Sequence, residues 1–154
     1  MKTTLTVLIW VIAGGLTLAG TGKDAPGTYE KESRYDVATT VDHITEAASE
    51  AGWVLPGDHD MQATLKKGGK EVLPSTIVVL CNGGYAYKFL KDDEMRKVQS
   101  LLPCRVAVYE KSDGKTYIAW SNYKKKGKEF GKPAASVFEE IHDDLEDIMA
   151  TVVK

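Results

Sequence analysis

Two cysteines, Cys81 and Cys104, are the side chains of this chain with the clearest capacity for chemistry. Cys81 ends the apolar run TIVVL and is followed by Asn82, Gly83 and Gly84, whereas Cys104 follows Leu-Leu-Pro. A pair of thiols is enough for one disulfide, half of a metal site or one redox couple. The chain has no C-x-x-C, C-x-x-C-H or zinc-type spacing, so the spacing alone does not choose among these.

Three interpretations of the cysteine pair follow. In an exported protein, a structural disulfide closing the 22 residues between them would contribute about 2–4 kcal/mol. If a parallel crossover separates the strand ends, the thiols are two independent buried side chains. In the third interpretation they form a working site that binds a metal or haem iron, or that cycles between thiol and disulfide with Cys81 as nucleophile and Cys104 as resolving thiol.

The residues after Cys81 favour a ligand pocket. Cys81 stands a few residues before a predicted helix, where free amides and the helix dipole favour a thiolate or another anionic group. Gly83 and Gly84 allow a ligand to approach the backbone closely. We therefore expect Cys81, Asn82, Gly83, Gly84 and Cys104 to line one binding site.

His59 is the histidine best placed for a second ligand group. It lies in the sequence GDHDM with Asp58 and Met61, in a predicted loop or helix cap. Imidazole and carboxylates hold divalent metals, and histidine with methionine ligates haem iron. The pattern predicts a metal or haem site at Asp58, His59 and Met61 that converges with the cysteine pocket. A capping aspartate and a core methionine are the alternative. His43 and His142 are both expected at solvent-facing helix positions.

The charge pattern does not favour nucleic acid as a partner. The formal net charge is -2, and a protein that binds nucleic acid is usually basic overall. One lysine-rich segment is interpreted as a solvated loop, with anionic lipid headgroups as the alternative; its lysines are Lys124, Lys125, Lys126, Lys128 and Lys132.

The N-terminus predicts export. Lys2 precedes an apolar stretch that ends in small residues, which is the order of a secretory signal peptide. We assign residues 1–22 to the signal peptide, or to an uncleaved N-terminal anchor, residues 23–28 to a linker and residues 29–154 to one folded domain. The expected location is the periplasm or the extracellular space.

Alternating and helical periods predict an α+β domain, a two-layer sandwich with a mostly antiparallel sheet and helices on one face. A first strand is expected over 28–39 and a helix after Thr40; a second helix, capped by Asp58 or Asp60, covers the MQATLKK segment. An Asp113-Gly114 type I′ turn is expected between two strands, and a Ser136/Glu139 capping box before an apolar last helix. The other expected elements are a short extended piece at 53–55, a buried strand at 76–81, a helix at 85–100 and strands at 103–111 and 116–123.

Several of these stretches resemble the DUF302 family, which has the TT1751-like fold. The resemblance lies in Gln62-Ala63-Thr64-Leu65, Cys81-Asn82, the segment 101–110 and the Asp113-Gly114 turn. It covers roughly residues 35–152 and implies a two-layer sandwich, often a homodimer, with no settled activity. Gly83 stands where the family commonly has proline.

These features together predict an exported, non-enzymatic module that binds a small ligand, a metal or haem. The alternatives are a thiol–disulfide redox protein that uses Cys81 and Cys104, and a purely structural or interaction domain with a Cys81–Cys104 disulfide. Neither the ligand nor the state of the two sulfur atoms follows from the residues.

Overall fold

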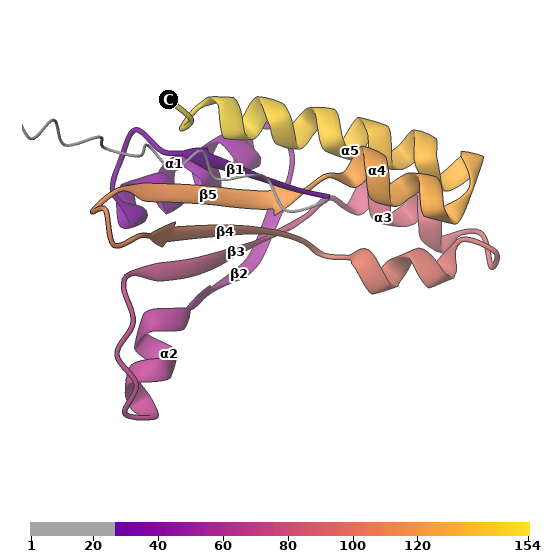
Figure 1. Cartoon of the computed structure of the whole chain (residues 1–154). Coiled ribbons are helices and arrows are strands. Elements are labelled where there is room, and N and C mark those ends of the chain that lie inside the picture. The colour runs from indigo at the N-terminus through magenta and orange to yellow at the C-terminus, as the bar shows by residue number, and fades with distance from the viewer. Residues whose placement is uncertain (1–26) are drawn as a thin grey trace, which may run out of the picture.

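The protein, described here from a computed structural model for residues 27–154, is built on one five-stranded antiparallel sheet in the order β1-β5-β4-β3-β2. Helices α1 and α5 cover one face, and α2 lies beyond the edge formed by β2 and β3, away from α5 (Figure 1). The signal peptide expected at 1–22 lies outside the described residues. The strands are β1 (Thr28–Glu32), β2 (Val54–Asp60), β3 (Ser75–Cys81), β4 (Cys104–Glu110) and β5 (Thr116–Ser121). The α-helices are α1 (Val37–Glu50), α2 (Met61–Lys67), α3 (Gly83–Leu90), α4 (Tyr123–Gly127) and α5 (Lys132–Ala150).

The α+β prediction is therefore confirmed, with every neighbouring pair of strands antiparallel. The alternation of apolar and polar side chains along β4 places the apolar ones on the face that the helices cover. Val106 and Val108 are buried, whereas Arg105 between them is exposed. Within residues 27–154, no helix combines the length and the hydropathy needed to cross a membrane.

The apolar stripe of the last helix forms the centre of the core, as its spacing predicts. Its predicted members, Val137, Phe138, Ile141, Leu145, Ile148, Met149 and Val152, are all buried. The Phe138 ring lies 5.0 Å from that of Phe89 and 5.9 Å from that of Tyr123, measured between ring centroids. Gly127 of α4 approaches so closely that an added Cβ would lie 2.6 Å from the Cβ of Phe138. These contacts hold α3 and α4 against α5.

Two helix starts differ from the sequence prediction because other residues cap them. Helix α1 begins at Val37, where Asp36 accepts a hydrogen bond from the Thr39 amide (2.8 Å). Thr40, expected to be the cap, is instead buried and its hydroxyl pairs with that of Ser33. The Ser136/Glu139 capping box is also wrong, because α5 begins earlier, at Lys132, after Gly131.

Three further segments depart from the expectations. Strand β2 continues through Pro56 and Gly57 by means of a register shift, instead of ending there. Helix α3 ends at Leu90, and a separate 3-10 helix covers Arg96–Leu101. The basic segment expected as a loop forms α4 and a 3-10 turn, Lys128–Phe130.

The connection between β4 and β5 is a tight turn, although not of type I′. A type I′ turn needs positive φ at both central residues, and here Gly114 has φ 75° while no residue other than glycine has positive φ among those described. The Gly114 amide donates to the Lys111 carbonyl and the Lys111 amide to the Lys115 carbonyl. This pattern fits a hairpin loop that is longer than the two-residue type I′ connection and that contains one left-handed glycine.

Candidate functional site

The two cysteines lie at meeting strand ends. Strands β3 and β4 are antiparallel neighbours, and Leu80 is directly opposite Cys104 in the register. The end of β3 therefore lies beside the start of β4, so the parallel-crossover alternative is wrong. Both cysteines are free thiols.

Cys81 and Cys104 both line one small hollow between the sheet end, α3 and α5. Its volume is about 10 Å³, which is the space of a single water-sized group. A haem-sized macrocycle does not fit this hollow. The remaining lining residues are Trp53, Leu80, Asn82, Tyr85, Ala86, Leu102, Pro103 and Ile141.

The two thiols differ in environment. Cys104 is 1% exposed, and burial raises the pKa of its thiol to about 11, while the Tyr123 hydroxyl acts in the opposite direction and Cys81 in the same one. Cys81 is only half-buried. Because a thiolate is the reactive form, Cys104 is a protected thiol and Cys81 the accessible one.

Asn82 occupies the N-cap of α3. Its side-chain Oδ1 accepts hydrogen bonds from the amides of Gly84 (2.9 Å) and Tyr85 (3.3 Å). These amides, which we expected to be available to an anion, thus already have a protein partner. The amide groups at the start of α3 therefore hold this helix in position beside Cys81 and do not offer an anion site.

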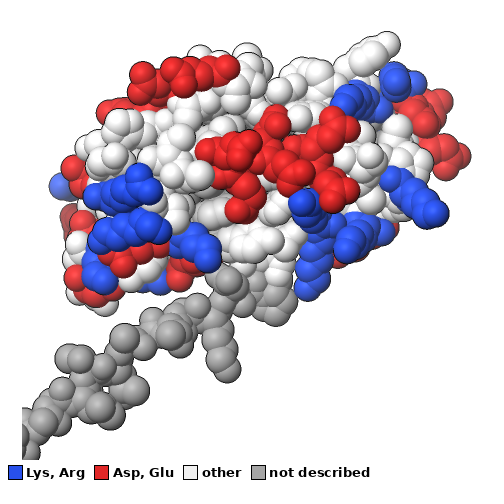
Figure 2. Space-filling view, turned by 90° about the horizontal axis from the view of Figure 1, so that it is seen from above, with Lys and Arg blue, Asp and Glu red and all other residues white. Residues whose placement is uncertain are grey.

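A hydrogen-bonded wall encloses the hollow on the helix side. Asp144 of α5 accepts hydrogen bonds from the Trp53 indole (3.2 Å) and from the Tyr85 hydroxyl (2.9 Å). Burial raises the pKa of the Tyr85 phenol and Asp144 raises it further, so that Tyr85 remains a donor. Figure 2, which views the molecule from above Figure 1, shows one group of acidic side chains near the middle of the surface, further acidic groups at its edges, and most Lys and Arg toward its two ends.

Sequence reasoning missed this wall. Trp53 and Asp144 are 91 residues apart in the chain, and neither belongs to a recognisable motif. The only available signal was that Asp144 lies next to Leu145 of the apolar stripe, which places it at the edge of the buried helix face.

The structure does not bring the Asp58, His59 and Met61 group to the cysteines. His59 lies on strand β2 rather than in a loop, opposite Ile77. Ile77 is four residues from Cys81 along β3, which corresponds to about 13 Å. Asp58 and His59 are exposed, and Met61 begins α2. Across residues 27–154, no three His, Cys, Asp or Glu side chains group as metal ligands.

The other two histidines have different surroundings. His43 on α1 is partly exposed, with its ring 4.7 Å from the ring of Tyr35. The expectation that His142 faces solvent is wrong, because it is 6% exposed and its ring stacks on Tyr29 at 5.6 Å. The position is buried because α5 passes over the strand that carries Tyr29.

Selective alkylation is expected to separate the two thiols. With a pKa of about 11 in place of 9.0, Cys104 is ionised about 100-fold less often at pH 8. Iodoacetamide should therefore modify Cys81 first, and peptide mass spectrometry should locate the label. Since the folded state holds the Cys104 proton more tightly than the unfolded state, this thiol contributes stability below pH 9 that is lost as the pH rises through about 11.

Unfolded protein in guanidinium is the control, where both cysteines should react alike. Equal labelling rates at the two positions in the native protein would contradict the assignment.

Comparison with known proteins agrees with this fold. The family model described as "Domain of unknown function DUF302" matches residues 29–152. A solved structure titled "Crystal structure of uncharacterized conserved protein DUF302 from Bacillus stearothermophilus" is similar in fold, with a TM-score of 0.73 and 20% identity. The alignment covers 82% of this chain and 98% of that one. No curated protein matches the chain.

Proposed function

The chain belongs to the DUF302 family, and on this basis and its two-cysteine hollow we propose that it is a non-enzymatic module that binds one thiophilic metal ion. The observation that carries the proposal is the presence of both thiols on a single hollow of about 10 Å³. A space of this size suits an ion and not an extended organic ligand.

The donor set favours a soft ion of low coordination number. Thiolate sulfur selects ions such as Cu(I), whereas structural zinc sites use four protein ligands. Asn82 and Tyr85, which also line the hollow, are engaged in other hydrogen bonds. Two sulfur donors at such a site suit Cu(I) better than Zn(II).

The register favours an ion over a disulfide. Leu80, and not Cys81, is directly opposite Cys104, and successive strand side chains start toward opposite faces. A disulfide needs Cβ atoms about 3.5–4.5 Å apart. With the zinc–sulfur bond length of about 2.3 Å as a guide, an ion bonded to both sulfur atoms spans sulfur atoms up to about 4.6 Å apart, so it requires less movement of the backbone.

Competition titration with Cu(I) under anaerobic conditions tests the proposal. The reduced protein is expected to take one equivalent from a chromogenic chelator, and Cys81→Ser should weaken binding about 100-fold or more because one of two sulfur ligands is lost. Cys104→Ala should weaken Cu(I) binding to the same degree. Because Cys104 is buried, this variant can fail to fold, and the test then depends on Cys81→Ser. Circular dichroism checks the fold of each variant.

His59→Ala is the matched control, since His59 lies far from the hollow along β2. It should bind Cu(I) like the unchanged protein. Equal affinity in the Cys81→Ser variant would overturn the proposal. So would failure to bind Cu(I) together with loss of two hydrogens by mass on treatment with oxidised glutathione, a result that would instead indicate the thiol–disulfide alternative.

A further inference from the structure

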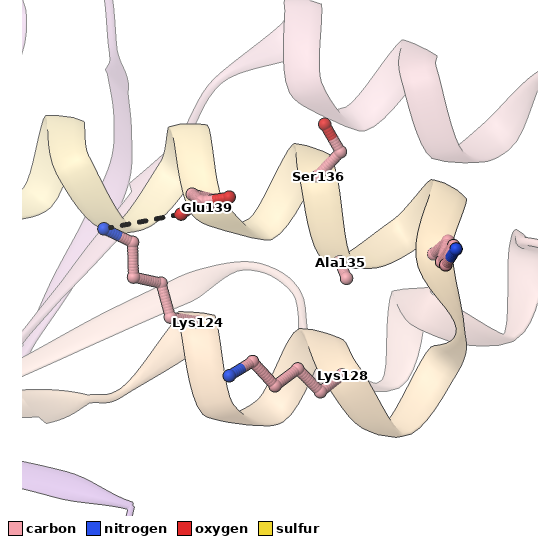
Figure 3. A pocket seen from close by; sticks show the side chains of 6 residues that line it. Lys124, Lys128, Ala135, Ser136 and Glu139 are labelled. Carbon is pink, nitrogen blue, oxygen red and sulfur yellow. Dashed lines mark ion pairs between the residues drawn. The ribbon is translucent and has the colours of Figure 1, made fainter.

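A second hollow, distinct from the cysteine site, lies between α4 and α5 at the end of the molecule. Its volume is about 310 Å³. Figure 3 shows Lys124 extending from α4 toward Glu139 of α5, and Lys128 lying alongside α4 with its ammonium group on the side of Lys124. Its lining consists of Lys124, Lys128, Lys132, Ala135, Ser136 and Glu139.

The three lysines are not equivalent. Lys124 is held by carboxylates, at 2.8 Å from Asp143 and 3.8 Å from Glu139. Lys128 and Lys132 are exposed and form no ion pair with any residue in 27–154. The uncompensated positive charge in the hollow is therefore that of Lys128 and Lys132.

The start of α5 forms one side of the hollow. Gly131 precedes this 19-residue helix and supplies no side-chain cap. The helix dipole adds partial positive charge at its first turn, where Lys132 and Ala135 line the hollow. The helix field therefore adds to the charge of Lys132.

The scaffold under these lysines is rigid. Gly127 packs against Phe138, and the ring of Phe130 lies 6.3 Å from that of Phe138. The Asn122 side chain caps α4 through the Lys125 amide (2.8 Å). Because the backbone that carries Lys128 is already ordered, binding of an anion needs ordering of the side chains only.

We propose that the α4–α5 hollow binds a phosphoryl group between Lys128, Lys132 and the first turn of α5. The charge of the phosphoryl dianion matches the two ammonium groups, and the volume admits it with part of the molecule that carries it. The phosphoryl group belongs either to a small soluble phosphate or to a lipid headgroup. The proposal does not depend on the proposed metal site.

Titration with inorganic phosphate at low ionic strength, followed by amide NMR shifts, tests the site. Saturable shifts are expected at the amides of Gly131, Lys132, Ala134 and Ala135. The Lys128→Gln/Lys132→Gln variant should bind about tenfold more weakly because two nearby charges are removed. Both positions are exposed, so the fold is expected to be unchanged.

The matched control is Lys66→Gln/Lys67→Gln in α2, which changes net charge equally at two exposed lysines. Its affinity should stay close to that of the unchanged protein. Equal weakening in both double variants would show only general attraction and would overturn the proposal.

Vesicles of phosphatidylcholine with and without phosphatidic acid distinguish the source of the group. Binding that needs phosphatidic acid and is lost in Lys128→Gln/Lys132→Gln assigns a lipid headgroup, whereas binding of free phosphate alone assigns a soluble molecule. Absence of binding to both probes overturns the proposal. The Cys81→Ser variant should bind phosphate normally, so the two proposals fail independently.

Discussion

Replacement of Phe138 by alanine is expected to lower the free energy of unfolding by about 3–5 kcal/mol. Phe138 is fully buried and its ring contacts aromatic rings from three different segments, those of Phe89, Tyr123 and Phe130. Loss of the ring leaves a cavity at the junction of α3, α4 and α5. The surrounding side chains collapse only partly into such a space, so the cost exceeds simple transfer of the ring to water.

Guanidinium unfolding followed by far-UV circular dichroism measures this loss. The matched control is Tyr87→Ala, which removes an aromatic ring that is 67% exposed. It should change stability by about 0.5 kcal/mol or less. A Phe138→Ala variant no less stable than Tyr87→Ala would contradict the placement of this ring at the centre of the core.

Replacement of Asp144 by alanine is expected to lower the free energy of unfolding by about 2–3 kcal/mol. Its carboxylate accepts hydrogen bonds from both Trp53 and Tyr85, and a hydrogen bond to a charged group contributes about 1.5–3 kcal/mol. Because Trp53 is 3% exposed, its indole N–H would be left without a partner. Two such bonds would contribute about 3–6 kcal/mol, and the partial exposure of Asp144 lowers the expected loss to about 2–3 kcal/mol because solvent screens the carboxylate.

Thermal or guanidinium unfolding measures the change, and two further variants separate its causes. Asp147→Ala, three residues on, alters an exposed carboxylate that makes no hydrogen bond or ion pair with other residues in 27–154, and should have little effect. Asp144→Asn keeps an acceptor oxygen without the charge and should recover part of the loss. Equal stabilities for Asp144→Ala and Asp147→Ala would show that the wall does not hold α5 to Trp53 and Tyr85.

The same variant tests the link between the wall and the cysteine hollow. Trp53 and Tyr85 both line that hollow, so their release should expose Cys104. Faster alkylation of Cys104 in Asp144→Ala than in Asp147→Ala is the expected sign. This comparison connects a contact between distant helices to the protection of one thiol.

Periodicity explains why the core could be predicted. A two-residue period on β4 and a mixed three- and four-residue spacing on α5 are properties of short segments. They identified Val106, Val108 and Phe138 as inward-facing, and each is buried. Such patterns survive in the sequence because burial selects apolar residues at every position of one face.

Helix ends and turns were less predictable because several residues compete to cap them. Asp36 and Thr40 are both suitable caps by type, and Asp36 is the one used. Packing decides the outcome, since Thr40 reaches Ser33 only when α1 lies over the end of β1. His142 shows the same effect, because its burial depends on Tyr29, a residue far away in the chain.

The residues alone determined the α+β class, the identity of the apolar stripe and the two thiols with the greatest capacity for chemistry. Only the tertiary structure decided that β3 and β4 run antiparallel, so that Cys81 and Cys104 share a hollow while His59 lies elsewhere on β2. The physical reason is the distance along the chain over which each effect acts. Periodic burial acts between neighbours in the chain, whereas strand register and helix docking depend on contacts between segments that the local sequence does not encode.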